Sequence, residues 1–179
     1  MEWTDVDYEN LVESCLSVAR PEKVTYLVAC ASKKLDRPAR ARDLYVSTWF
    51  RAAREYVGGR PWFILSALHG LVRPEQELAP YNRTLKDLDR QSRACWGARV
   101  ASSVRKLVPA DHRLVVLAGR AYVDPLANQS LFTTENPAIR VLGYQAEFPL
   151  QGMGIGRQVQ FSQQLIARHI AFDGPRHPR

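Results

Sequence analysis

The chain has 179 residues, of which 46% are hydrophobic and 24% are charged, so we expect one folded domain and exclude a disordered or fibrous protein. The longest apolar runs, such as 114–118, are far shorter than the ~20 residues that a membrane span requires, and we expect no membrane partner. Lys and Arg outnumber Asp and Glu by 25 to 18, a net charge of +7. This excess favours nucleic acid, a nucleotide or a nucleoside as partner, although a basic surface can also serve solubility alone.

The chain begins with an acidic stretch that lacks the pattern of a secretion signal, and its three cysteines form no CxxC pair. Its histidines do not stand at the spacing of metal ligands. We therefore expect a cytoplasmic protein without a metal or another cofactor. The oligomeric state is left open.

Taken in chain order, the first expected element is an amphipathic helix within residues 1–20, which has apolar side chains at helical spacing. Short apolar strands, bounded by Pro, Gly or charged residues, are expected at 24–30, 62–67, 114–118 and 139–142. Helical periodicity between and after these strands predicts helices over 41–57, 89–107, 122–131 and 157–170. The tail, 173–179, is expected to be a disordered basic end.

Strands that alternate with helices predict a single α/β domain over residues 1–172, with helices on both faces of a mainly parallel, four-stranded sheet. The expected arrangement thus has three layers, α/β/α. Ligands of such sheets bind where the parallel strands end. The loops that begin near Cys30, Ala67, Ala118 and Gly143 are therefore expected to form one rim.

The first of these loops places Cys30, Ser32, Lys33 and Lys34 directly after a buried strand. Two adjacent ammonium groups can hold a phosphate, and one lysine can act as a nucleophile if a dry site removes its proton. The alternative is a turn with solvated lysines and a core cysteine.

The helix expected after this loop has a polar face with Asp43 and Ser47, which stand four residues apart. Asp43 is a candidate for orienting water or stabilising a cationic sugar. The other face, which includes Tyr45, is interpreted as packed core and not as a platform for stacking bases.

The second loop is long and proline-rich, and it contains His69 and Gly70 after the strand residue Ser66, and further on Tyr81 and Asn82. A stiff loop of this kind holds binding groups in place. His69 is a candidate acid, base or hydrogen-bond donor, and a purely structural histidine is an equal alternative. Tyr81 is expected to stack on a base.

Two further segments belong to the expected rim. Gly119 and Tyr122 follow the third strand, while Gly152 and Gly154 belong to a G-x-G-x-G stretch before the last helix. Glycines before a helix let the backbone N–H groups approach an anion. The spacing does not match a dinucleotide-binding fingerprint.

Four separated blocks of sequence resemble known families. CASKKLDRPARARDLYVSTWF, ILSALHGLVRPEQELAPYNRTL, VVLAGRAY and PLQGMGIG resemble a group of small bacterial and phage proteins of uncharacterised function, over Val24 to about Ile166. The second block also resembles the YaaA peroxide-stress family. The first two blocks resemble the uracil-glycosylase-like domain of archaeosine synthase. The residues that match its signature are Cys30, Ser32, Lys33 or Lys34, Ser47, Phe50, Gly70, Leu71, Val72 and Pro74.

The resemblance implies a uracil-DNA-glycosylase-like fold and a role directed at a nucleobase. The leading interpretation is an enzyme that cleaves an N-glycosidic bond or processes a modified base, with His69, Asp43 and Lys33 as its catalytic residues. The alternatives are a non-catalytic protein that binds damaged or modified DNA or RNA, and a transferase that acts on a deazaguanine base through Lys33 or Cys30.

Overall fold

The computed structural model describes residues 23–133 and 143–150 and, nearer the C-terminus, residues 153–154, 156–157, 160–161, 163–164 and 167. The helix expected within 1–20, the strand expected at 139–142, the tail 173–179 and Gly152 lie outside the described residues.

The main sheet has five strands in the order β4-β3-β1-β6-β7. β1 pairs in parallel with both β3 and β6, and β7 is parallel to β6, whereas β4 is antiparallel to β3. The expected mainly parallel sheet is thus confirmed, but the expected number of four strands is wrong. The strands are β1 (Val24–Ala29), β3 (Trp62–Ser66), β4 (Gly70–Val72), β6 (Arg113–Leu117) and β7 (Ala146–Glu147).

The sequence pattern did not indicate β4 and β7 because both are very short. β4 lies inside the stretch that was interpreted as a binding loop, and it folds back onto β3 through a tight turn. Gly70 has a φ of +78° at the end of that turn, which is a conformation that favours glycine. β7 begins only after Gly143. The strand expected before Gly143, at 139–142, lies outside the described residues, so the place expected for Gly143 at a strand end stays a prediction.

The helices are α2 (Ala41–Leu44), α3 (Thr48–Val57), α4 (Arg90–Leu107) and α5 (Arg120–Ala127), with a 3-10 turn η1 (Leu85–Asp87). A separate two-stranded ladder pairs β2 (Ala39–Arg40) with β5 (Glu77–Leu78). The helix expected over 89–107 is confirmed, with Asp89 as its N-cap, because the Asp89 carboxylate accepts from the Ser92 N–H. The expected helix over 122–131 begins two residues earlier and ends four residues earlier.

The single helix expected over 41–57 is wrong, because the chain is extended between α2 and α3. Tyr45 forms an antiparallel bridge with Lys34, and the Val46 N–H donates to the Lys33 carbonyl at 3.0 Å. Ser47 then caps α3 by accepting from the Phe50 N–H at 3.1 Å. Consequently Asp43 and Ser47 do not share a helix face.

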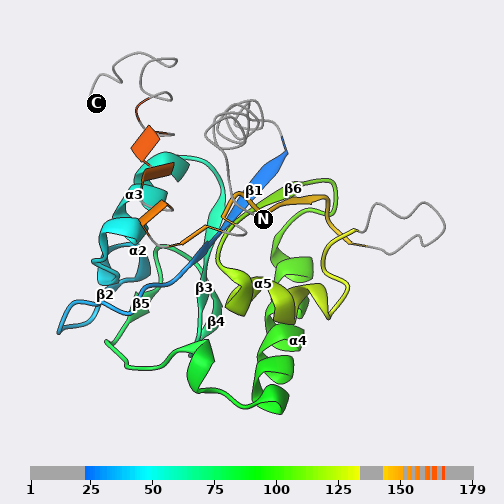
Figure 1. Cartoon of the computed structure of the whole chain (residues 1–179), viewed down its shortest axis with the longest axis horizontal. Helices are drawn as coiled ribbons and strands as arrows, with labels where there is room; N and C mark the ends of the chain where they lie inside the picture. The colour runs from blue at the N-terminus through cyan, green and yellow to red at the C-terminus, as the bar shows by residue number, and fades with distance from the viewer. Residues whose placement is uncertain are drawn as a thin grey trace.

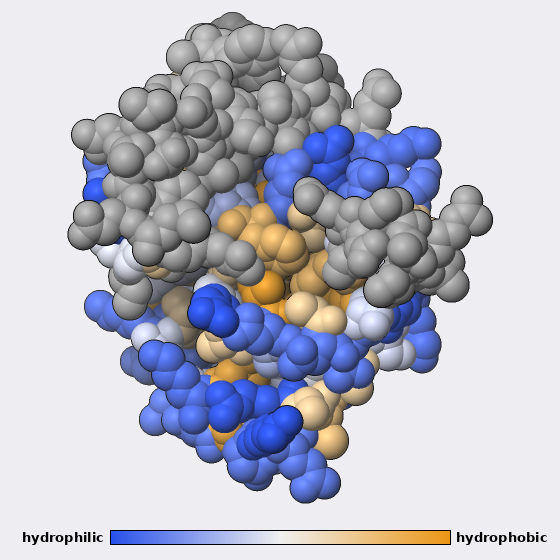
Figure 2. Space-filling view, turned by 45° about the vertical axis from the view of Figure 1, so that its right-hand side comes forward, coloured by the Kyte–Doolittle hydropathy of each residue, from blue (hydrophilic) through white to orange (hydrophobic). Residues whose placement is uncertain are grey.

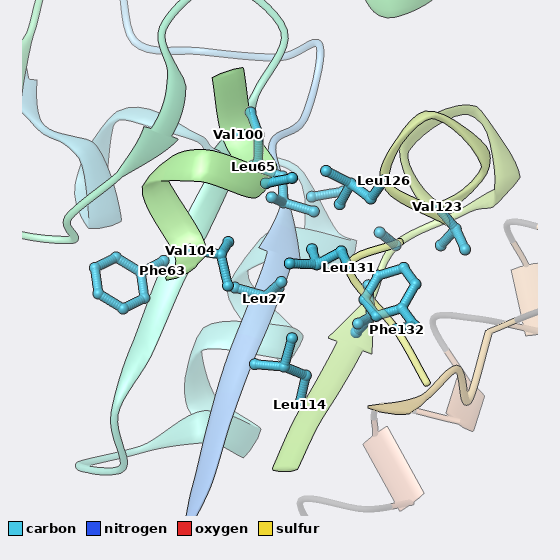
Figure 3. Packing of buried hydrophobic residues seen from close by; sticks show 14 of the residues in the cluster. Leu27, Phe63, Leu65, Val100, Val104, Leu114, Val123, Leu126, Leu131 and Phe132 are labelled. Carbon is cyan, nitrogen blue, oxygen red and sulfur yellow. The ribbon is translucent and has the colours of Figure 1, made fainter. Parts of the chain in front are cut away.

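The main sheet is buried on both faces. Successive β1 residues point to opposite sides of the sheet, and all of them are buried. Tyr26 and Val28 pack in a cluster with α2 and α3, whereas Leu27 and Ala29 pack in a cluster with α4 and α5. Figure 1 shows α2 and α3 on one side of the sheet and α4 and α5 on the other. In Figure 3, Leu27 lies among side chains from α4, β6 and the segment after α5.

Most large apolar side chains are buried in these two clusters, and Leu107 is the one described large apolar residue classed as exposed. Figure 2 shows apolar residues in the middle of one face, with hydrophilic residues beside them. None of the described helices combines the length and apolar character that a membrane span requires.

Candidate functional site

Three parallel strands end at one edge of the sheet, where Cys30, Ala67 and Ala118 follow β1, β3 and β6, as expected from the sequence. The loop after β1 and the loop after β4 are joined to each other by the β2–β5 ladder. The Ala41 N–H adds a bond to the Gln76 carbonyl at 2.7 Å. Two loops that are far apart in sequence are therefore held as one unit.

A network of hydroxyl groups lies beside this edge. The Tyr81 hydroxyl is 2.8 Å from the Tyr45 hydroxyl and 2.8 Å from the Ser66 hydroxyl. Ser66 Oγ also accepts from the backbone N–H of His69 at 3.0 Å. Ser66 is 0% exposed and Tyr45 is 1% exposed, so the bonds inside the network are shielded from water. The network links both loops to the end of β3.

Trp96 of α4 supports this network from the other face of the sheet. Its indole N–H donates to the Ser66 carbonyl at 2.9 Å, and its ring stands edge-on to Tyr122, with centroids 5.7 Å apart. The Tyr122 hydroxyl is 3.3 Å from Cys30 Sγ. Ser66, which ends β3, and Cys30, which follows β1, are therefore connected through α4 and α5.

Lys34 places its ammonium group on the aromatic part of the network. Its Nζ lies 4.2 Å from the centre of the Tyr81 ring and 5.6 Å from that of Tyr45, and it donates to the Ser32 carbonyl at 3.2 Å. Burial lowers the pKa of Lys34 below its usual value, an effect that the charge of Cys30 partly opposes. No described carboxylate forms an ion pair with Lys34.

The phenols of the site remain protonated at neutral pH. Burial, with a smaller effect from the charge of Cys30, raises the pKa of Tyr45 to about 12. The same two causes raise the pKa of Tyr81 and of Tyr122. Each phenol therefore offers one hydrogen-bond donor and an acceptor.

His69 is exposed, and its ring stands edge-on to Tyr81 with centroids 5.1 Å apart. Partial burial, and secondly the positive charge of Arg99, lower the pKa of His69 below its usual value. The imidazole is consequently neutral at pH 7 and has one N–H donor and one acceptor nitrogen.

The structure thus brings together seven of the fifteen expected site residues, from three parts of the chain. They are Cys30, Lys34, Ser66, His69, Gly70, Tyr81 and Tyr122. Tyr45, Trp96 and Arg99 were not expected there. Tyr45 was assigned to the core alone, and the spacing of Trp96 and Arg99 on α4 carries no signal of a site.

Other expected site residues have structural roles instead, and Gly119 meets the cluster through its carbonyl, which accepts from the Tyr122 N–H at 2.9 Å. Asp43 forms ion pairs with Arg54 at 2.6 Å and with Arg42 at 3.7 Å. Ser47 serves as the cap of α3, and Gly119 is the N-cap residue of α5.

Four more expected residues are exposed. Lys33 accepts through its carbonyl from the Val46 N–H, and its ammonium group forms no ion pair with a carboxylate in the part of the chain that the structure describes. Asn82 has no described side-chain partner, and a Cβ added at Gly154 would meet open space. Ser32, the fourth, contributes its carbonyl to Lys34.

The described residues contain no group of three His, Cys, Asp or Glu side chains placed to hold a metal ion. The chemistry of the described cluster is that of an amine, a thiol, an imidazole and hydroxyl groups.

One family model matches residues 25–164 of the chain, and its description is a family of unknown function, DUF6884. No curated protein and no solved structure matches the chain. These findings provide no link to the YaaA family or to archaeosine synthase, so that resemblance stays a prediction.

Proposed function

The chain belongs to DUF6884, and from its own residues we propose that it is an enzyme directed at a nucleobase in nucleic acid or in a nucleoside. Its reaction is cleavage of an N-glycosidic bond or processing of a modified base. The observation that carries this proposal is the Lys34 amine, which lies over the Tyr81 ring and has no carboxylate partner among the described residues.

A lysine amine attacks carbon only after it has lost its proton, and burial favours this loss at Lys34. Lys33, which the sequence analysis named as the catalytic lysine, is exposed. The structure therefore supports moving the nucleophilic role from Lys33 to Lys34. Asp43 receives no role, because its carboxylate is paired with arginines.

In the proposed reaction the Lys34 amine forms a bond to the sugar carbon C1′ while the glycosidic C–N bond breaks. The bonding electrons leave with the base, which takes up a proton, and the attacking amine releases one. Opening of the sugar ring gives an imine on Lys34, and water hydrolyses it to an aldehyde sugar and the free amine. The net reaction is hydrolysis.

His69 and Tyr81 can assist the departing base. The neutral His69 ring offers an N–H to a base nitrogen that becomes negative, and such electrostatic help is larger in the transition state than in the ground state. Tyr81 lies between the two groups: the Lys34 amine lies over its ring, and the His69 ring stands edge-on to it. A base inside a duplex has to be flipped out first, at a cost of a few kcal/mol.

We also propose a more specific type of fold. A sheet with buried cores on both faces and a cluster of polar groups at the ends of its parallel strands supports a three-layer, uracil-DNA-glycosylase-like arrangement.

A transferase that acts on a deazaguanine base is the second candidate. The observation in its favour is the half-buried Cys30 thiol, which lies 3.3 Å from the Tyr122 hydroxyl and is a second nucleophile beside the same strand ends. In this candidate the base is retained and modified, so no free base is released.

The test compares Lys34→Met with Lys33→Met, its neighbour of equal charge. Modified and unmodified oligonucleotides and nucleosides are incubated with each protein, released bases are measured by mass spectrometry, and borohydride reduces any imine to a stable adduct. We expect wild type and Lys33→Met to release base and form the adduct, and Lys34→Met to lose at least about 10²-fold in rate and form none.

Equal loss in both variants would contradict the role of Lys34. Salt-dependent binding without any product, in wild type, would instead support the non-catalytic binding protein. A base that gains mass at the expense of an added donor, without release, would support the transferase.

A further inference from the structure

Arg99 of α4 lies beside the turn that carries His69. Its Nη2 donates to the Leu68 carbonyl at 3.3 Å, and a Cβ atom added at Gly70 would lie 3.4 Å from its Nε. The guanidinium group thus spans the turn on both sides of His69. A guanidinium has five N–H donors, and among the described residues this bond to Leu68 is the one that the Arg99 guanidinium makes, which leaves the other donors for a ligand.

Four basic side chains beside this edge of the sheet have no ion-pair partner among the described residues. Lys33, Lys34, Arg83 and Arg99 form no ion pair with any described carboxylate. Arg83 follows Tyr81 by two positions and is exposed.

The opposite edge of the sheet shows a different pattern. Lys23, just before β1, pairs with Asp111 at 3.0 Å, and Arg113, at the start of β6, pairs with Glu147 at 2.9 Å. Cations without an ion pair to a described carboxylate also occur elsewhere, as at Arg51, Arg105 and Lys106. What sets this edge apart is that such cations lie beside the hydroxyl network and the His69 turn. An anion is the ligand that such an arrangement attracts.

We infer that Arg99 binds a phosphate group of the ligand that occupies this site. The planar guanidinium can donate two parallel bonds to phosphate oxygens, and Arg is favoured wherever such paired recognition is needed. Its place at the His69 turn puts the phosphate next to the base-directed groups. This inference rests on the proposed function, which makes the ligand a nucleobase compound. It adds that the ligand carries a phosphate, so that it is a nucleotide unit and not a free nucleoside.

The shared chemistry is a phosphate ester, which a DNA strand, an RNA strand or a mononucleotide can supply. The test measures binding of a short single-stranded DNA, an RNA of the same sequence, a nucleoside 5′-monophosphate and the corresponding nucleoside, at several salt concentrations. Arg99→Ala is compared with Lys106→Ala. Lys106 is exposed and lies seven residues further along the same helix, about 10 Å away. Its substitution by Ala removes the same charge as Arg99→Ala.

We expect the nucleoside to bind most weakly, and Arg99→Ala to weaken binding of the preferred phosphate-bearing probe by about tenfold, with a salt slope lower by about one contact. Lys106→Ala should change affinity by less than about twofold, and Arg99→Lys should retain part of it. The preferred probe identifies the source of the phosphate.

Equal effects of Arg99→Ala and Lys106→Ala, or tight binding of the nucleoside unaffected by Arg99→Ala, would overturn the inference. Base release separates this failure from that of the proposed function. If Lys34→Met abolishes release but Arg99→Ala binds like wild type, only the phosphate site is wrong. If no probe releases base but Arg99→Ala selectively weakens binding, the phosphate site stands and the glycosidic reaction is wrong.

Discussion

The hydroxyl of Tyr81 lies 2.8 Å from the hydroxyl of Ser66, although 15 positions of the chain separate the two residues. Because Ser66 ends β3 and Tyr81 follows β5, this bond fixes the far end of the long loop to the sheet. Tyr45 joins the same hydroxyl from the loop after β1.

Removing the Tyr81 hydroxyl should therefore cost more stability than removing that of Tyr45. Tyr81→Phe loses two hydrogen bonds, whereas Tyr45→Phe loses one and leaves the Tyr81–Ser66 bond intact. At about 1 kcal/mol for each bond, we expect a loss of about 2 kcal/mol against about 1 kcal/mol in urea unfolding. A larger loss in Tyr45→Phe would contradict the central position of Tyr81.

The pKa of His69 should be lower than usual, and Arg99→Ala should raise it without restoring it fully, because partial burial remains the larger cause. Titration of the His69 ring signals by NMR measures both values. Since the folded pKa is depressed, the unfolded chain takes up the proton first as the pH falls. The stability linked to His69 should thus decline from about pH 6.5 down to the folded pKa, and should be fully present above that range.

His69→Ala should lower base release by about 10²-fold while changing the affinity for the same substrate only slightly, because the ring assists the departing base and is exposed. The measurement is a comparison of single-turnover rate with equilibrium binding. An unfolded variant would assign His69 a structural role, and an unchanged rate in the folded variant would remove its catalytic role.

Gly97→Ala should strongly destabilise the protein, because a Cβ at Gly97 would lie 2.4 Å from the Pro125 carbonyl oxygen, which belongs to the backbone of α5. Relief requires α4 and α5 to separate, and we expect a loss of at least about 2 kcal/mol in thermal or urea unfolding. Gly59→Ala is the control, since a Cβ there meets nothing within 4 Å. Similar stability of the two variants would show that the helices can shift at little cost.

The long apolar strands β1, β3 and β6 could be predicted from the sequence because each buries both faces and so forms a continuous apolar run. The parallel order followed from their alternation with helices. Neither β4 nor β7 could be found this way, since two or three residues carry no periodicity.

The break between α2 and α3 had one local signal, the Ser47 that caps α3, but the apolar spacing of 41–57 continues across it. The bridge between Tyr45 and Lys34, which is a tertiary contact, overrides that spacing. For the same reason the sequence could place Cys30, Ser66, His69 and Tyr81 on one edge, yet it favoured Lys33 as the catalytic lysine, whereas the structure places Lys34 beside the network.

The β2–β5 ladder, which ties the loop after β1 to the loop after β4, also limits how this site can be rebuilt. A graft that exchanges only one of the two loops would remove one partner from each backbone pair that joins them. These pairs include Ala39 with Leu78 and Ala41 with Gln76. Changes of specificity by loop exchange therefore have to take residues 30–47 and 67–85 together, β4 included, while β1, β3 and β6 remain in place.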